Sequence, residues 1–157
     1  MKNLWIAVIL VLIFNGCRKS DNLSEIPKIT FVSLTANQNS SGKDTLGILV
    51  FDYEDGDGDL GALSTDSLSL LNLFITFYEK KNGVFTAPVL PPPGFDARIP
   101  NLTPKAKNKS ISGDITRTLL LPPGVIKDTI KFTVYLVDRA NHKSNEIETS
   151  ELVITTQ

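Results

Sequence analysis

The chain has 157 residues, and its 16 Lys and Arg against 17 Asp and Glu give a formal net charge of −1. This length fits one domain with a short appendage. The charge lacks the basic excess of a nucleic-acid-binding protein, so we expect no nucleic-acid partner. Cys17 is the only cysteine, which excludes an internal disulfide and a cysteine-based zinc site.

The start of the chain has the pattern of an export signal. The apolar run Leu4–Phe14 has 11 residues, whereas a helix that spans a bilayer needs about 20. Such a run is typical of a secretory signal peptide. Gly16 then precedes Cys17, and this ending resembles the lipobox of bacterial lipoproteins, in which the signal is cut before a cysteine that carries a diacylglycerol. The alternative is an ordinary cleaved signal with an incidental cysteine.

The resemblance divides the start of the chain into two parts. It implies a signal peptide over residues 1–16, followed over residues 17–25 by a lipidated Cys17 and a polar tether. It also implies that the membrane is a partner through the N-terminal lipid. The positively charged Arg18 after the cysteine does not suggest retention in the inner membrane. We therefore expect an outer-membrane lipoprotein of the cell envelope, facing the periplasm or the cell surface.

The rest of the chain has the pattern of a β-protein. Short apolar runs with a period of two residues alternate with turn sequences, without the 3.6-residue period of a helix. The expected strands are residues 26–35, 45–53, 70–79, 110–121, 129–138 and 148–155. Asn82-Gly83 predicts a hairpin turn. Pro88–Gly94 predicts a stiff crossover between two sheets, with a polyproline ligand for a partner as the alternative. The pattern predicts an all-β fold, an immunoglobulin-like antiparallel β-sandwich of about seven strands, over residues 26–157.

An acidic loop is the part of the sequence with the clearest chemistry. Phe51–Gly61 (FDYEDGDGDLG) carries five acidic side chains within eight residues. Alternating Asp and Gly let a tight loop direct several carboxylates to one centre, and such oxygen ligands are the ones that calcium takes. We therefore predict that Asp55, Asp57 and Asp59 bind Ca²⁺. The alternative is a solvated turn, because Asp and Gly are also common turn residues.

Topology predicts a fourth metal ligand, Asp138. In an immunoglobulin-type sandwich, the loop after the second strand and the loop before the last strand lie at the same pole. Asp138 shares the parity of the inward-facing Phe132 and Val134 in the preceding strand. We therefore expect its carboxylate to emerge at the pole that holds the acidic loop.

Four motifs carry a further resemblance. They are Phe51–Gly61, Asn72–Lys80 (NLFITFYEK), Ile99–Pro104 (IPNLTP) and Val137–Asn145 (VDRANHKSN). In this combination the chain resembles small lipoproteins of the Bacteroidota that carry an immunoglobulin-like domain and have no assigned function. The resemblance implies a calcium-stabilised surface or periplasmic sandwich, and it implies no reaction.

The sequence therefore favours a protein that is not an enzyme. His142 is the only histidine, and no nucleophile–base pair is recognisable around it. We expect a structural or interaction role, with a protein or glycan partner that the sequence does not identify. The alternative is a carbohydrate-binding accessory module, which would need exposed aromatic rings in a row, drawn from Tyr53, Tyr78, Phe85, Phe95 and Tyr135.

Overall fold

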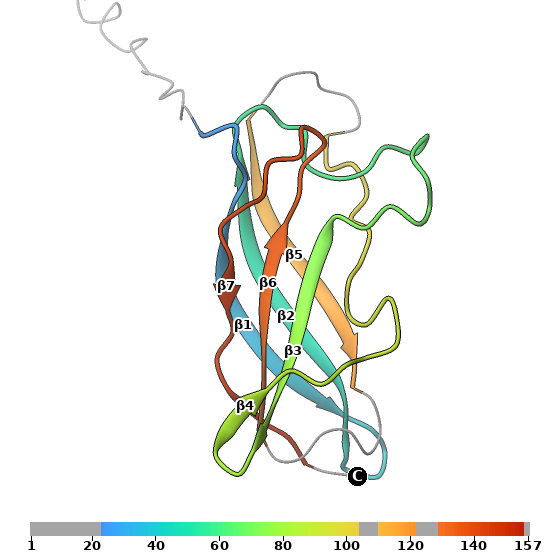
Figure 1. The fold of residues 1–157 in the computed structure, drawn as a ribbon, viewed down its shortest axis with the longest axis vertical. Helices are drawn as coiled ribbons and strands as arrows, with labels where there is room; N and C mark the ends of the chain where they lie inside the picture. Colours follow the sequence, from blue (N-terminus) through green and yellow to red (C-terminus); the bar gives the residue numbers. More distant parts are fainter. Residues whose placement is uncertain (1–22, 104–109, 122–128, 156–157) are drawn as a thin grey trace, which may run out of the picture.

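Figure 1 shows a computed structural model of the chain, which describes residues 23–103, 110–121 and 129–155. These residues form eight strands and no helix: β1 (Lys28–Gln38), β2 (Asp44–Asp55), β3 (Leu73–Lys81), β4 (Val84–Thr86), β5 (Ile111–Leu120), β6 (Thr129–Leu136), β7 (Ile147–Glu148) and β8 (Leu152–Val153). In this part of the chain, accordingly, there is no helix of the length and apolarity that crossing a membrane requires. The predicted signal peptide and Cys17 lie outside the described residues.

The strands form two sheets whose order confirms the predicted β-sandwich. One sheet has the order β1-β2-β5 and the other β4-β3-β6-β7, with β8 also pairing to β6. All pairings between these strands are antiparallel. The second strand thus lies beside the fifth and the third beside the sixth, which is the neighbour pattern of an immunoglobulin-type sandwich.

The last strand, predicted as one run, is divided into β7 and β8. Thr149 lies between them, and its hydroxyl accepts a hydrogen bond from the Phe132 N–H at 3.0 Å. A side-chain oxygen therefore replaces the backbone carbonyl at this point of the ladder. Both short strands still pair with β6, so together they take the place of one strand.

The core lies between the sheets and follows the predicted alternation along β3 and β6. Its fully buried side chains include Phe132 and Val134 of β6. Pro88–Gly94 lies in the connection from β4 in one sheet to β5 in the other, but this segment does not itself cross between the sheets, because the chain first returns to the edge of β3, where Ala97 pairs with Leu73. Immediately after this segment, Phe95 enters the core and meets the ring of Phe132 edge-on, with a centroid distance of 5.3 Å. The residue that directly follows Pro88–Gly94 is therefore packed into the sandwich.

Candidate metal centre

The acidic loop leaves β2 at Asp55 and is fixed against a distant segment of the chain. Gly61 has a φ of 93°, and a Cβ there would lie 2.2 Å from the carbonyl oxygen of Pro100. Only glycine fits this conformation and this close approach. On the same segment, the Thr103 hydroxyl donates to the Gly58 carbonyl at 2.6 Å. The loop is therefore held in one shape by contacts that the sequence pattern alone does not indicate.

Three carboxylates of this loop converge. Asp55, Asp57 and Asp59, here called the Asp cluster, each offer one carboxylate oxygen, and these oxygens lie within 4.8 Å of one another. Asp55 is completely buried, and its Oδ2 accepts a hydrogen bond from the Leu60 N–H at 3.0 Å. The Oδ1 atoms of all three residues are buried, and no group in the described part of the chain donates a hydrogen bond to them. The loop thus buries three carboxylate oxygens that receive no hydrogen bond from the described part of the chain.

The energetic cost of this arrangement is visible in the pKa values. Burial raises the pKa of the Asp55 carboxyl to about 6; the Leu60 N–H opposes the shift, and the charges of Asp57 and Asp59 add to it. Burial also raises the pKa of Asp59, and the charges of Asp138 and Asp57 raise it further. Arg139 and the Ala140 N–H act in the opposite direction. The ionised cluster therefore repels itself, and a bound cation would relieve this repulsion.

Asp138 lies at the same pole, as the topology predicts. Its charge acts on Asp59, but its own two oxygens face His142. Oδ1 accepts the His142 backbone N–H at 2.7 Å, and Oδ2 lies 3.0 Å from His142 Nδ1. A carboxylate has about four lone-pair sites. Asp138 therefore retains capacity for a further partner and stays a predicted ligand, outside the three that converge most closely.

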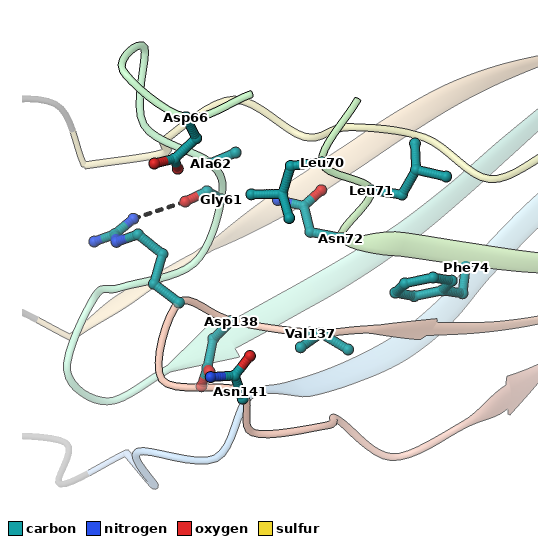
Figure 2. Close-up of a pocket in the computed structure, with 11 residues that line it drawn as sticks. Gly61, Ala62, Asp66, Leu70, Leu71, Asn72, Phe74, Val137, Asp138 and Asn141 are labelled. Atoms are coloured by element: carbon teal, nitrogen blue, oxygen red, sulfur yellow. Dashed lines mark hydrogen bonds between the residues drawn. The ribbon is translucent and has the colours of Figure 1, made fainter. Parts of the chain in front are cut away.

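Arg139 links the acidic loop to the turn after β6, and the sequence pattern did not single it out. Its Nη1 donates to the Gly61 carbonyl at 2.7 Å, the dashed line in Figure 2, and lies 3.2 Å from Asn101 Oδ1. Beside this link is a pocket of about 430 Å³. Figure 2 shows that Leu70 and Leu71 lie on one side of this pocket and Val137 on the other. The pocket forms between segments that are far apart in the chain, so the sequence alone does not predict it.

His142 and Ser144 do not form a nucleophilic pair. The Ser144 hydroxyl accepts the Leu136 N–H at 2.9 Å and donates to the Asn145 carbonyl at 2.7 Å. The residue is buried. The serine oxygen therefore hydrogen-bonds the backbone, and the imidazole of His142 hydrogen-bonds Asp138.

Tyr135, Phe85 and Phe95, three of the five rings on which a sugar platform would depend, do not offer open faces for a sugar. Phe74 and Tyr135 stack on each other with a centroid distance of 4.8 Å, and Lys143 Nζ lies 3.8 Å from the centroid of Tyr135. At the other end of the sheet, Lys131 Nζ lies 4.4 Å from the centroid of Phe85. Phe95 is buried in the core. Neighbouring rings and ammonium groups therefore occupy ring faces on which a sugar would stack.

The chain matches no protein-family model, no curated protein and no solved structure. Fold and site together define the class as an all-β antiparallel sandwich with converging carboxylates at one pole. We call this end of the molecule the acidic pole.

The ion-free protein is expected to become more stable as the pH falls from about 7.5 to about 5. Asp55 has a folded-state pKa of about 6, above its ordinary 3.8, so between these values the folded state holds a proton that the unfolded state releases. The charge of Asp138 raises the pKa of His142, so the contribution of His142 is also lost as the pH rises. Thermal melting in chelator at several pH values measures this trend.

A His142→Gln variant serves as the control, because it retains only the part of the pH dependence that comes from the carboxylates. Calcium should suppress that part, since a bound cation favours the ionised carboxylates. A melting temperature in chelator that stays constant or falls on acidification would contradict this prediction.

Proposed function

We propose that this protein is a membrane-anchored, calcium-stabilised β-sandwich with a non-enzymatic structural or interaction role at the cell envelope. The observation that supports calcium most directly is the completely buried Asp55, whose Oδ1 lacks a hydrogen-bond donor in the described part of the chain. An anionic oxygen buried in this way is costly unless a cation pairs with it. Asp57 and Asp59 bring two more such oxygens to the same place.

The donor set fits calcium. Calcium takes about six to eight oxygen ligands in flexible geometry, and it accepts carboxylates, backbone carbonyls and waters. Asp55, Asp57, Asp59 and Asp138 are the residues that would hold the ion. When bound, the ion supplies positive charge and no reaction is assigned to it. Thermal melting in calcium and in chelator tests this part of the proposal.

The consequence of binding would be a stiffer acidic pole. Asp57 and Asp59 belong to the loop after β2, whereas Asp138 follows β6. These two segments already meet through the Arg139 bond to Gly61. A shared cation would add a second and stronger link between them. A cation shared in this way would hold the loops around the acidic pole in one arrangement.

The membrane anchor of the proposal rests on the lipobox-like ending at Cys17. From this resemblance we propose an outer-membrane location, facing the periplasm or the cell surface. The partner is proposed to be a protein, because the covered ring faces of Tyr135 and Phe85 speak against a glycan platform.

Mass spectrometry of the mature N-terminus is expected to show a chain that begins at Cys17 and carries a diacylglycerol-based lipid. The protein should then fractionate with membranes. A Cys17→Ser variant should lose the lipid, because the thiol is the site of attachment. A second variant that combines Cys17→Ser with Ser20→Cys keeps one cysteine in the chain but moves it, and it should also lack the lipid. An unmodified wild-type terminus in the soluble fraction would contradict the proposal.

A further inference from the structure

The described chain enters the sandwich at the acidic pole and is fixed there. The Gly56 N–H donates to the Ser24 carbonyl at 2.7 Å. A Cβ on Gly56 would lie 2.3 Å from the Leu23 carbonyl oxygen, so only glycine allows the two segments to pack this closely. The backbone of Glu25 also lies close enough to His142 to raise the pKa of its imidazole. The entry point is therefore part of the same pole as the Asp cluster.

The covalent distance from this entry point to Cys17 is short. Leu23 is six residues after Cys17, and an extended chain spans at most about 3.6 Å per residue, which gives about 20 Å. The sandwich itself is longer than this reach. β2 alone has 12 residues, which at about 3.3 Å per residue makes about 40 Å. A lipid on Cys17 would therefore keep the acidic pole near the bilayer while the opposite pole can lie farther away.

Exposed leucines lie on a loop that leaves this same pole. Residues 61–72, here called the leucine loop, connect the acidic loop to β3, and Leu63, Leu68 and Leu70 on it are 38%, 87% and 44% exposed. Figure 1 shows the loop projecting sideways at about the height at which the described chain begins. The loop contains no Lys or Arg. Ile26, next to the entry point, is 53% exposed.

The leucine loop holds a defined shape while it exposes these side chains. The Leu63 N–H donates to Asp66 Oδ2 at 2.7 Å, and the Leu70 N–H donates to the Ser67 carbonyl at 3.1 Å. Arg98 donates to the Leu63 carbonyl from outside the loop. These hydrogen bonds thus hold the loop in a shape that leaves Leu68 largely exposed and Leu63 and Leu70 partly exposed, although apolar side chains gain free energy when they leave water.

We propose that the leucine loop is a second membrane contact, which inserts its leucine side chains into the interface of the bilayer that holds the lipid anchor. This inference rests on the proposed lipidation of Cys17. A tether of about 20 Å makes the loop's encounter with the bilayer an intramolecular event, so a weak contact is sufficient. The sandwich would then stand with its acidic pole toward the membrane and its β3–β4 hairpin away from it.

Tryptophan fluorescence of the mature, lipidated protein in reconstituted vesicles tests this orientation. Leu68→Trp places the reporter on the leucine loop, and Val84→Trp places a matched reporter in β4, where Val84 is 64% exposed. The only natural tryptophan, Trp5, lies in the signal peptide and is absent from a mature chain that begins at Cys17, so each variant carries a single reporter. The vesicles are phosphatidylcholine with or without brominated acyl chains. Their zero net charge prevents repulsion by the carboxylates from deciding the result.

The expected result is that brominated chains quench the tryptophan at position 68 and leave the one at position 84 unchanged. The emission at position 68 should also shift to shorter wavelength. If brominated chains quench neither reporter although mass spectrometry verifies the lipid on Cys17, the inference is overturned and the anchor stays intact. A blue shift at position 68 without quenching would mean that protein, such as a second copy, covers the loop, which also overturns it. An unmodified Cys17 would overturn both the anchor and the inference.

Discussion

In chelator at about pH 7.5, an Asp55→Asn variant is expected to unfold at a higher temperature than the wild type. The ionised Asp55 is completely buried, and its pKa of about 6 against an ordinary 3.8 corresponds to a cost of about 3 kcal/mol at this pH. Asparagine removes the charge but keeps an oxygen for the Leu60 N–H. Its amide can also donate to the Oδ1 atoms of Asp57 and Asp59, which receive no hydrogen bond from the described residues. We therefore expect a stabilisation on the order of 1–3 kcal/mol.

In millimolar calcium the order of the two proteins is expected to reverse. The substitution removes one anionic ligand, so the variant gains less from the ion than the wild type does. Melting curves of both proteins in chelator and in calcium measure the reversal. Asp52→Asn is the matched control, because Asp52 lies three residues earlier on the same strand, β2, and is exposed. A change of the same sign in both buffers would mean that Asp55 acts without an ion.

Much of the fold follows from the alternation of apolar residues. The inward parity of the strand at residues 129–138 is sufficient to predict the buried face of β6. Irregularities in the pairing of strands cannot be predicted from this alternation. The register of β1 against β2 shifts between Phe31 and Ser33, and this bulge exposes half of Val32. A bulge depends on how two strands meet, so neither strand indicates it alone.

The burial of β2 is a second feature that the sequence pattern does not predict correctly. Its run of apolar residues on both parities suggests a strand that is covered on both faces. In the structure Leu49 and Phe51 are buried, whereas Ile48 and Val50 on the outer face are only half-buried. Aliphatic side chains on an open face gain stability from cross-strand neighbours. Their presence therefore does not require a further layer.

The candidate site likewise has a part that the sequence predicts and a part that it does not. Alternating Asp and Gly in one loop predict the Asp cluster, because neighbours in sequence stay neighbours in space. The approach of Gly61 to Pro100 and the bond from Arg139 to the loop join segments that are far apart in the chain. The hydrogen bonds between Asp138 and His142 depend on a turn in which Asn141 has a φ of 70°. Composition and spacing contain no signal for these contacts.

The central claim is that calcium binds the Asp cluster and stabilises the acidic pole. An ion that binds only the folded protein at 100 times its Kd adds about 2.7 kcal/mol. For a domain of this size that raises the midpoint of unfolding by about 5–10 °C. Asp57→Asn and Asp138→Asn should each remove most of this gain, because each takes one charge from the same ion. Asp52→Asn should leave the gain unchanged.

The most direct measurement is the melting temperature of the protein in millimolar calcium and in excess chelator, compared among the wild type, Asp57→Asn and Asp52→Asn at one pH and protein concentration. The calcium account predicts a clearly higher midpoint in calcium for the wild type and Asp52→Asn, and a much smaller difference for Asp57→Asn. Equal midpoints in calcium and chelator for the wild type would contradict it and leave the acidic loop as a solvated turn.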